Sequence, residues 1–441
     1  MHGETAFGWS AAWLATAVFV GTYALVIGDK LNRAILALLG AALLILCGVL
    51  NQEAAIRGID FNTIGLLLGM MLIVNITAKS GVFQYVAIWS AKRVNAQPLG
   101  VLFMLSMVTA LLSALLDNVT TVLLVVPVTL LITEELKVKA YPYLIAEVLC
   151  SNIGGTATLI GDPPNIMIGS LVGIPFNDFI YHLTPVVIVV LLVSAVPFYF
   201  LWRTELVASE KARRRVMEFE EREAIHDWRL LRQALFVLAL VLTGFFTSRL
   251  THLEPATVSM GGAALLLLLD NFRKSAEEQG ASVQKAFAEV EWVTLMFFAG
   301  LFILVHGLEA SGVIRTMAEK LLAATQGDRT VTVLAVLWGS AFLSAFIDNI
   351  PFVATMIPLI KSMAPAFGGE QGLMPLWWAL SLGACLGGNG TLVGASANLV
   401  VAGLAERAGQ PIKFVPYLKS CFGLMILSIV VCHVYIYWRY L

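Results

Sequence analysis

Two similar sequence motifs decide the fold. They are LSALLDN at residues 112–118 and LSAFIDN at residues 343–349, which are identical at five of seven positions. A second pair follows them, GGTATLIGDPPN at 154–165 and GGNGTLVGASAN at 387–398, and it agrees at six of twelve positions. In both pairs the two motifs are similar in sequence and are separated by almost the same number of residues. Because self-similarity at a fixed offset is the signature of internal duplication, we predict that two copies of one structural unit are fused in this chain.

The composition places this duplicated unit in a membrane. Of the 441 residues, 59% are hydrophobic and 13% are charged, about half the charged share of a soluble protein. Apolar stretches of bilayer-crossing length recur along the whole chain, and helices satisfy their backbone hydrogen bonds within each segment. We therefore predict an all-α, multi-pass protein of the plasma (inner) membrane.

Several function classes lack their sequence signatures. The five cysteines are scattered in apolar segments without a C-x-x-C pair, which argues against disulfides, structural metal and metal cofactors. There is no Walker A motif for direct ATP use, although a cytoplasmic ATPase subunit could dock on the protein. The run KARRR at 211–215 precedes EFEERE, and such alternating charge is typical of a solvated helix rather than of nucleic-acid binding. No Gly-x-Gly-Asp word accompanies either Asp-Asn pair, so we expect no aspartyl protease and no enzyme.

Hydrophobic runs between helix breakers give ten predicted spans, two of them interrupted by polar residues. They are 7–28, 32–50, 61–79, 141–172 (interrupted), 181–202, 232–249, 254–270, 291–310, 376–405 (interrupted) and 415–438. The apolar stretches 98–133 and 329–363 each hold two runs with Asp-Asn between them. We interpret each as a re-entrant hairpin with Asp-Asn at its tip.

The number of crossings per copy decides how the copies are oriented. With a re-entrant hairpin, each copy crosses five times and the second copy is inverted; with full crossings, the copies are parallel. The inverted arrangement gives a first repeat at 1–202, a charged cytoplasmic connector at 203–231 and a second repeat at 232–441. It also places 21 of the 28 Lys and Arg residues on the cytoplasmic side, Lys30 and Arg33 among them. This bias favours inversion.

The two interrupted spans predict a solute site. Irregular backbone survives at membrane depth only where it is buried in protein or lines an aqueous cavity, so we expect both breaks to meet both hairpin tips. Free N–H and C=O groups at a break can hold a small polar solute and a cation. Gly154, Gly155, Gly387 and Gly388 would let backbone approach that solute. The alternative for such glycines is close helix packing.

Acids inside the predicted membrane region are candidates for ion coupling, because a buried carboxylate is costly unless it is protonated, paired or solvated. Asp117 and Asp348 hold equivalent positions at the hairpin tips. Each either caps the helix that follows or also carries a coupling proton. Asp162, whose counterpart is Ala395, is either an N-cap or a proton or cation site. Glu147 is a further candidate, with snorkelling to an interface as its alternative.

With these stretches in view, the chain resembles the ion transporter superfamily, within it the group that joins ArsB-type arsenite permeases and the pink-eyed dilution P protein. SALLDNVTTVLLVVPVTL, SNIGGTATLIGDPPN, FIDNIPFVATMIPL and LGACLGGNGTLVGASAN are similar to signature stretches of that group. At the first hairpin the better-studied bacterial arsenite permeases carry a different motif, close to NDG. The resemblance implies a homodimer with a scaffold domain, a mobile transport domain and an elevator-like movement.

The resemblance also implies a solute held between the hairpin tips and the breaks. Its residues would be Asn118, Thr120, Thr121, Ser151, Asn152, Thr156, Thr158, Asn165, Asn349, Asn389, Thr391, Ser396 and Asn398, beside Asp117 and Asp348. Cys150 and Cys385 flank the breaks and are either thiol ligands of arsenic or small apolar residues.

The leading hypothesis is a secondary transporter that extrudes arsenite or antimonite in exchange for protons. A neutral hydroxylated solute suits a site of amides, hydroxyls and backbone dipoles. The alternatives are a sodium/proton antiporter or an anion transporter for chloride or dicarboxylates. A channel is a separate class, which single-channel conductance steps would reveal.

Overall fold

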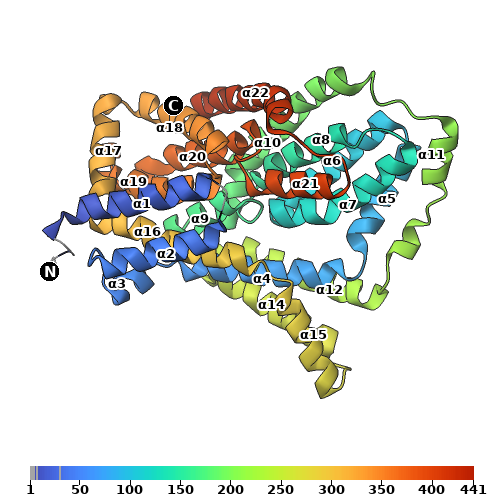
Figure 1. Cartoon of the computed structure of the whole chain (residues 1–441), viewed down its shortest axis with the longest axis horizontal. Coiled ribbons are helices and arrows are strands. Elements are labelled where there is room, and N and C mark those ends of the chain that lie inside the picture. Colours follow the sequence, from blue (N-terminus) through green and yellow to red (C-terminus); the bar gives the residue numbers. More distant parts are fainter. Residues whose placement is uncertain (1–4, 6–7, 29–30) are drawn as a thin grey trace.

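The computed structural model describes residues 5, 8–28 and 31–441, so Lys30 lies outside the described residues. Within this part of the chain all regular structure is helical, which confirms the predicted all-α class (Figure 1). Eight of the described helices are long and apolar enough to cross a membrane: α4 (Phe61–Ala78), α6 (Pro98–Leu115), α7 (Asn118–Leu136), α10 (Phe176–Trp202), α12 (Trp228–Phe246), α16 (Trp292–Ala310), α18 (Arg329–Phe346) and α22 (Phe414–Tyr440). Shorter apolar helices are α1 (Ala11–Ile27) and α2 (Arg33–Leu46). The helix α14 (Pro255–Asn271) covers most of the predicted span 254–270.

Each Asp-Asn pair stands at the turn between two helices that pack against each other. In the first half α6 and α7 meet at this turn, and in the second half α18 meets α19 (Asn349–Ser362). Asp117 and Asp348 are the N-cap residues of α7 and α19. Their carboxylates accept the backbone N–H of Thr120 at 2.8 Å and of Ile350 at 3.2 Å. The predicted capping role of both acids is therefore confirmed.

Both predicted breaks are present. The first separates α8 (Tyr141–Gly155) from α9 (Pro163–Val172), and the second separates α20 (Met374–Gly387) from α21 (Ser396–Arg407). A Cβ at Gly154 would lie 2.1 Å from the carbonyl oxygen of Ala110 in α6. A Cβ at Gly387 would lie 2.5 Å from that of Ala341 in α18. Both glycines thus allow close packing of α8 on α6 and of α20 on α18, the alternative that the sequence left open.

The helices fall into two groups. The framework group consists of α1, α2, α4, α12, α14 and α16, in which α2 packs along α16 and α4 along α14. A Cβ at Gly69 would lie 2.6 Å from the backbone of Ser259, and one at Gly300 would lie 2.6 Å from the backbone of Ala37. The hairpin group consists of α6–α10 and α18–α22 and lies beside the framework group (Figure 1). The hairpin turns and the breaks lie where the two groups meet.

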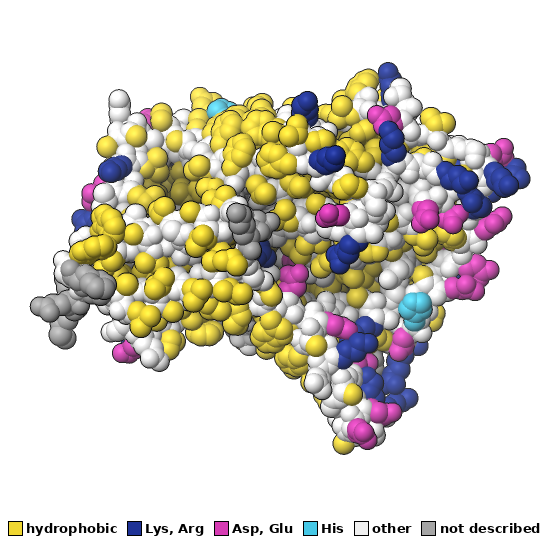
Figure 2. Space-filling view, in the orientation of Figure 1, with side chains coloured by type: hydrophobic (Ala, Val, Ile, Leu, Met, Phe, Trp, Pro, Cys, Tyr) yellow, Lys and Arg dark blue, Asp and Glu magenta, His cyan; other side chains and the backbone are white. Residues whose placement is uncertain are grey.

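Several helices between the spans were not predicted, because their apolar runs are too short to cross a bilayer. They are α3 (Gln52–Arg57), α5 (Val82–Arg93), α13 (Ser248–Thr251), α15 (Ala276–Ala288) and α17 (Val313–Ala324). A further helix, α11 (Glu210–Met217), lies where the KARRR run predicted a solvated helix. α5 and α17 each follow a glycine in the left-handed conformation, Gly81 with φ 85° and Gly312 with φ 81°. Figure 2 shows apolar side chains over most of one face and charged ones gathered at one end, over α11 and α15.

Candidate functional site

Buried asparagines join the first break to the second. The Asn152 side-chain amide in α8 donates from Nδ2 to Oδ1 of Asn389 at 2.9 Å and to Oδ1 of Asn398 at 3.0 Å. Its own Oδ1 accepts from Nδ2 of Asn118, the first residue of α7, at 3.1 Å. All four side chains are buried. The expectation that the breaks and the first hairpin tip meet is therefore confirmed.

Asp162 brings the second hairpin tip into the same network. Its Oδ1 accepts from Nδ2 of Asn118 at 3.2 Å and from Nδ2 of Asn349 at 3.4 Å. Asp162 precedes α9, yet its side chain makes no capping hydrogen bond there. Its Oδ2 is buried without a hydrogen-bond partner in the described chain, with the Cys385 thiol beside the carboxylate. Helix capping therefore does not explain why an acid is buried at position 162. A proton, a cation or another solute bound at Oδ2 would explain it.

A small cavity of about 20 Å³ lies between the hairpin tips and the first break. This volume holds about one water molecule or small ion. Its polar lining comes from both helix groups: Arg33, Asp117, Asn118, Asp162, Glu291, Thr294, Asn349 and Ser396. Asn118 Oδ1 is buried and unpartnered among the described residues. The cavity thus offers carboxylate and amide oxygens to a proton, a cation or a hydroxyl group.

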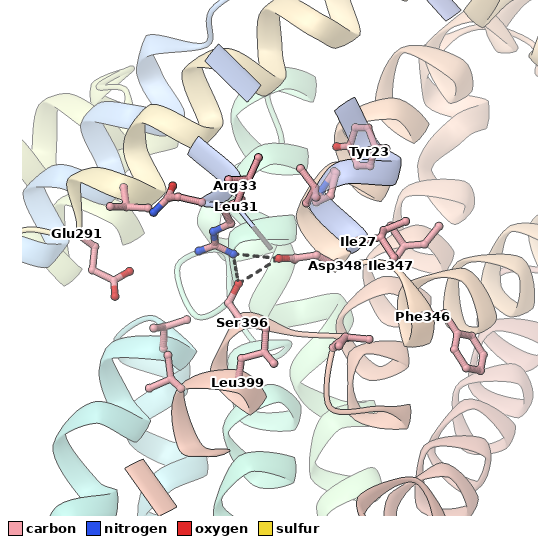
Figure 3. A pocket seen from close by; sticks show the side chains of 17 residues that line it. Tyr23, Ile27, Leu31, Arg33, Glu291, Phe346, Ile347, Asp348, Ser396 and Leu399 are labelled. Carbon is pink, nitrogen blue, oxygen red and sulfur yellow. Dashed lines mark hydrogen bonds and ion pairs between the residues drawn. The ribbon is translucent and has the colours of Figure 1, made fainter. Parts of the chain in front are cut away.

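A larger cavity of about 440 Å³ is also lined by Arg33 (Figure 3). Arg33 Nη1 lies 3.1 Å from Oδ2 of Asp348 and donates to Oγ of Ser396 at 2.6 Å. Ser396 Oγ in turn donates to Oδ2 of Asp348 at 3.2 Å. Figure 3 shows Glu291 pointing toward the same space from the side opposite Asp348. The site therefore contains a single described guanidinium among several carboxylates.

Most of the other predicted binding residues hold the breaks in shape. The hydroxyls of Ser151, Thr156, Thr158 and Thr391 donate to backbone carbonyls, and the amides of Asn165 and Asn398 donate to carbonyls within the breaks. The Thr120 hydroxyl donates to Asp117 at 2.5 Å. Thr121 Oγ1 is buried without a partner in the described residues. Gly155 and Gly388 lie against backbone carbonyls across their own breaks.

Glu147 is separate from this site. It is buried on α8 and accepts from the Thr129 hydroxyl of α7 at 2.5 Å, and neither cavity is lined by it. Its burial excludes snorkelling to an interface. Cys150 packs in an apolar cluster, while Cys385 lies 3.7 Å from Oδ1 of Asn165.

Arg33, Glu291 and Thr294 line the site but were not among its predicted residues. Arg33 was assigned to a cytoplasmic end because it stands where an apolar run begins. Glu291 stands at the start of a predicted span in the same way. No sequence signal separated them from interfacial charges; the structure shows that α2, which Arg33 begins, has only 14 residues and a length of about 21 Å, shorter than the predicted span 32–50. A helix this short cannot place both of its ends outside a hydrocarbon core of about 30 Å.

Comparison with known proteins agrees with this arrangement. The family model described as "Citrate transporter" matches residues 23–383. The chain belongs to the citrate transporter family. This membership confirms the predicted relation to the ion transporter superfamily and supports a multi-pass membrane transporter.

The similarity to individual proteins extends over most of this citrate transporter family chain. The chain is 43% identical to the "46 kDa membrane protein" of Mycobacterium leprae, across 97% of this chain and 99% of the relative. It is 33% identical to the P protein of Homo sapiens, across 97% of this chain and 60% of that longer protein. The crystal structure of the Alcanivorax borkumensis YdaH transporter shares the fold, with a TM-score of 0.54 and 14% identity over 88% of this chain and 87% of that one.

Proposed function

We propose that this protein is a secondary active transporter of the plasma membrane that extrudes arsenite or antimonite in exchange for protons. The observation that carries the proposal is the lining of the two cavities, in which Asp117, Asp162, Asp348 and Glu291 face one guanidinium, Arg33. Such a surplus of carboxylates repels polyanions and exchanges protons readily. A neutral trihydroxy species such as arsenous acid carries no charge to be repelled. Its hydroxyls can both donate to carboxylates and accept from amides.

The inverted-repeat and elevator predictions belong to the same proposal. Equivalent contacts recur in both halves at the offset found in the sequence. Ser113 Oγ donates to the Ser151 carbonyl at 2.7 Å, and Ser344 Oγ donates to the Ala384 carbonyl at 2.6 Å. These recurrences support repeats at 1–202 and 232–441 joined by the connector 203–231. The two helix groups would be the scaffold and the moving body, and a homodimer would anchor the scaffold.

A citrate-like anion is the second candidate substrate, because the family is described by citrate transport. Arg33 is the one described cation at the site, and its guanidinium is already bonded to Asp348. A carboxylate substrate would have to displace that partner and tolerate three further acids nearby. Sodium/proton exchange is the third candidate, supported by the unpartnered Oδ2 of Asp162.

The test uses everted membrane vesicles with an acidic interior and no ATP. Arsenite added outside should accumulate inside as protons leave, and Asp162→Asn should abolish the uptake. Antimonite, citrate, chloride and sodium are offered in parallel to the same vesicles. Gradient-driven uptake without ATP would also show that an ATPase subunit is not required. If arsenite and antimonite show no gradient-dependent uptake while citrate or sodium does, the proposed substrate is wrong.

A further inference from the structure

Arg33 connects the framework group to the tip of the second hairpin. On the framework side, Arg33 Nη2 donates to Thr294 Oγ1 of α16 at 3.1 Å. On the hairpin side, Arg33 Nη1 bonds Asp348 at 3.1 Å and Ser396 at 2.6 Å. Asp348 caps α19 and Ser396 begins α21. Any movement of the hairpin group along the framework group must therefore break these contacts.

The guanidinium has an alternative resting place on the framework. It lies over the Phe297 ring of α16, with the guanidinium carbon 5.2 Å from the ring centroid. Phe297 and Thr294 are both on α16, so Arg33 keeps partners there when Asp348 moves away. The ion pair is partly buried, since 26% of the Arg33 side chain and 17% of the Asp348 side chain are exposed. Its attraction is therefore screened less than that of a surface pair.

The charge on Asp348 decides whether this contact holds, because an arginine stays protonated in proteins. The other titratable groups around the two cavities are Tyr23 on α1, Glu291 before α16, Asp117 before α7 and Asp162 before α9. Asp348 forms an ion pair with Arg33, whereas none of these four groups does so in the described chain.

We propose that Arg33 is a built-in cation that clamps the tip of the second hairpin to the framework group, and that a proton on Asp348 opens the clamp. The opening of the clamp by a proton rests on the proposed proton coupling. Arg33 is thus a positioning residue for the movement. Its guanidinium stays paired with the Asp348 carboxylate until a proton binds that carboxylate and neutralises it.

The experiment measures access to the larger cavity without any substrate, so its failure is distinct from a failure of arsenite transport. Cys47 is replaced by Ser, and Leu399→Cys in the cavity wall serves as the reporter. Its labelling rate by a membrane-impermeant maleimide is divided by that of the exposed Ala281→Cys on α15, which removes the pH dependence of the thiol reaction. Arg57→Gln is the matched control, because Arg57 forms an exposed i,i+4 pair with Glu53.

We expect Arg33→Gln and Asp348→Asn to lower the normalised rate by about fivefold or more, because the clamp favours the state in which this cavity is open. Arg33→Lys keeps the charge but loses the guanidinium fork that reaches Thr294, Ser396 and Asp348 together, so its rate should fall between those of the parent and Arg33→Gln. Acidification should lower the rate in the parent but not in Asp348→Asn.

An unchanged or raised rate in both Arg33→Gln and Asp348→Asn would overturn the clamp. A pH response that persists in Asp348→Asn would overturn its release by Asp348. Misfolded variants are recognised by labelling of the buried Cys432 in the reporter-free background. If the variants misfold, the pH response of the parent decides the clamp, because a parent rate that ignores pH contradicts it.

Discussion

Removing the Asn152 side chain should destabilise the protein more than the loss of one ordinary hydrogen bond. Asn152→Ala strands the side-chain oxygens of Asn389 and Asn398, which lose the donors now at 2.9 Å and 3.0 Å. Asn118 loses one acceptor but keeps Asp162 at 3.2 Å. Each buried polar atom left unsatisfied costs about 1–3 kcal/mol, so two give about 2–6 kcal/mol.

The matched control is Asn75→Ala, which removes a single bond from Asn75 Nδ2 to the Glu289 carbonyl at 2.8 Å in a half-exposed setting. Its expected cost is about 1 kcal/mol. The assay is the temperature at which half of the purified protein remains monodisperse by size exclusion after heating. Asn152→Ala should lower this midpoint at least about twice as far as the control. Equal shifts would show that the amide network adds no more stability than one ordinary hydrogen bond, and would refute the expectation that two stranded oxygens raise the cost.

Three further outcomes follow from the packing and the charges. Gly154→Ala should prevent monodisperse expression, because the new Cβ would lie 2.1 Å from a carbonyl oxygen of α6, whereas Gly339→Ala, with open space around it, should express normally. Glu147→Gln should keep gradient-driven transport in the vesicle assay within a few fold, since Glu147 lines neither cavity, and complete loss would restore it as a coupling residue. Hydrogen bonding to Lys92 holds the pKa of Glu221 below its ordinary value. The contribution of this pair is therefore present at neutral pH and lost as pH falls through that lowered pKa, below about 4.3. Glu221→Gln should speed tryptic cleavage of the connector at neutral pH, and equal cleavage would contradict this docking role.

The sequence predicted the site best where polar residues interrupt apolar runs. The resemblance to the ion transporter superfamily pointed to Asn118, Asn152 and Asn398, and their side chains do bond one another. Glu147 was predicted because an acid inside a span is costly, but this rule cannot tell which buried acids share one site. Its partner is a hydroxyl on the neighbouring helix, 18 positions earlier in the chain.

Charges at the ends of apolar runs were harder to interpret, because they usually mark the membrane interface. Arg33 and Glu291 fit that expectation in sequence and yet line the central cavity. For Arg33 helix length is the physical reason, since the short α2 begins inside the protein. The connecting helices α5 and α17 were missed for a related reason: each has only 12 residues and so carries no bilayer-length run.

The repeat also shows how one substitution separates two equivalent acids. Thr120 gives Asp117 both a backbone N–H and a hydroxyl, so both carboxylate oxygens are satisfied within their own hairpin. At the equivalent position of the second half stands Pro351, which has neither group. Asp348 therefore caps through Ile350 with one oxygen and keeps the other free for Arg33. If this explanation is correct, Pro351→Thr should weaken the Arg33 contact and slow reporter labelling as Arg33→Gln does, and a parent-like rate would refute it.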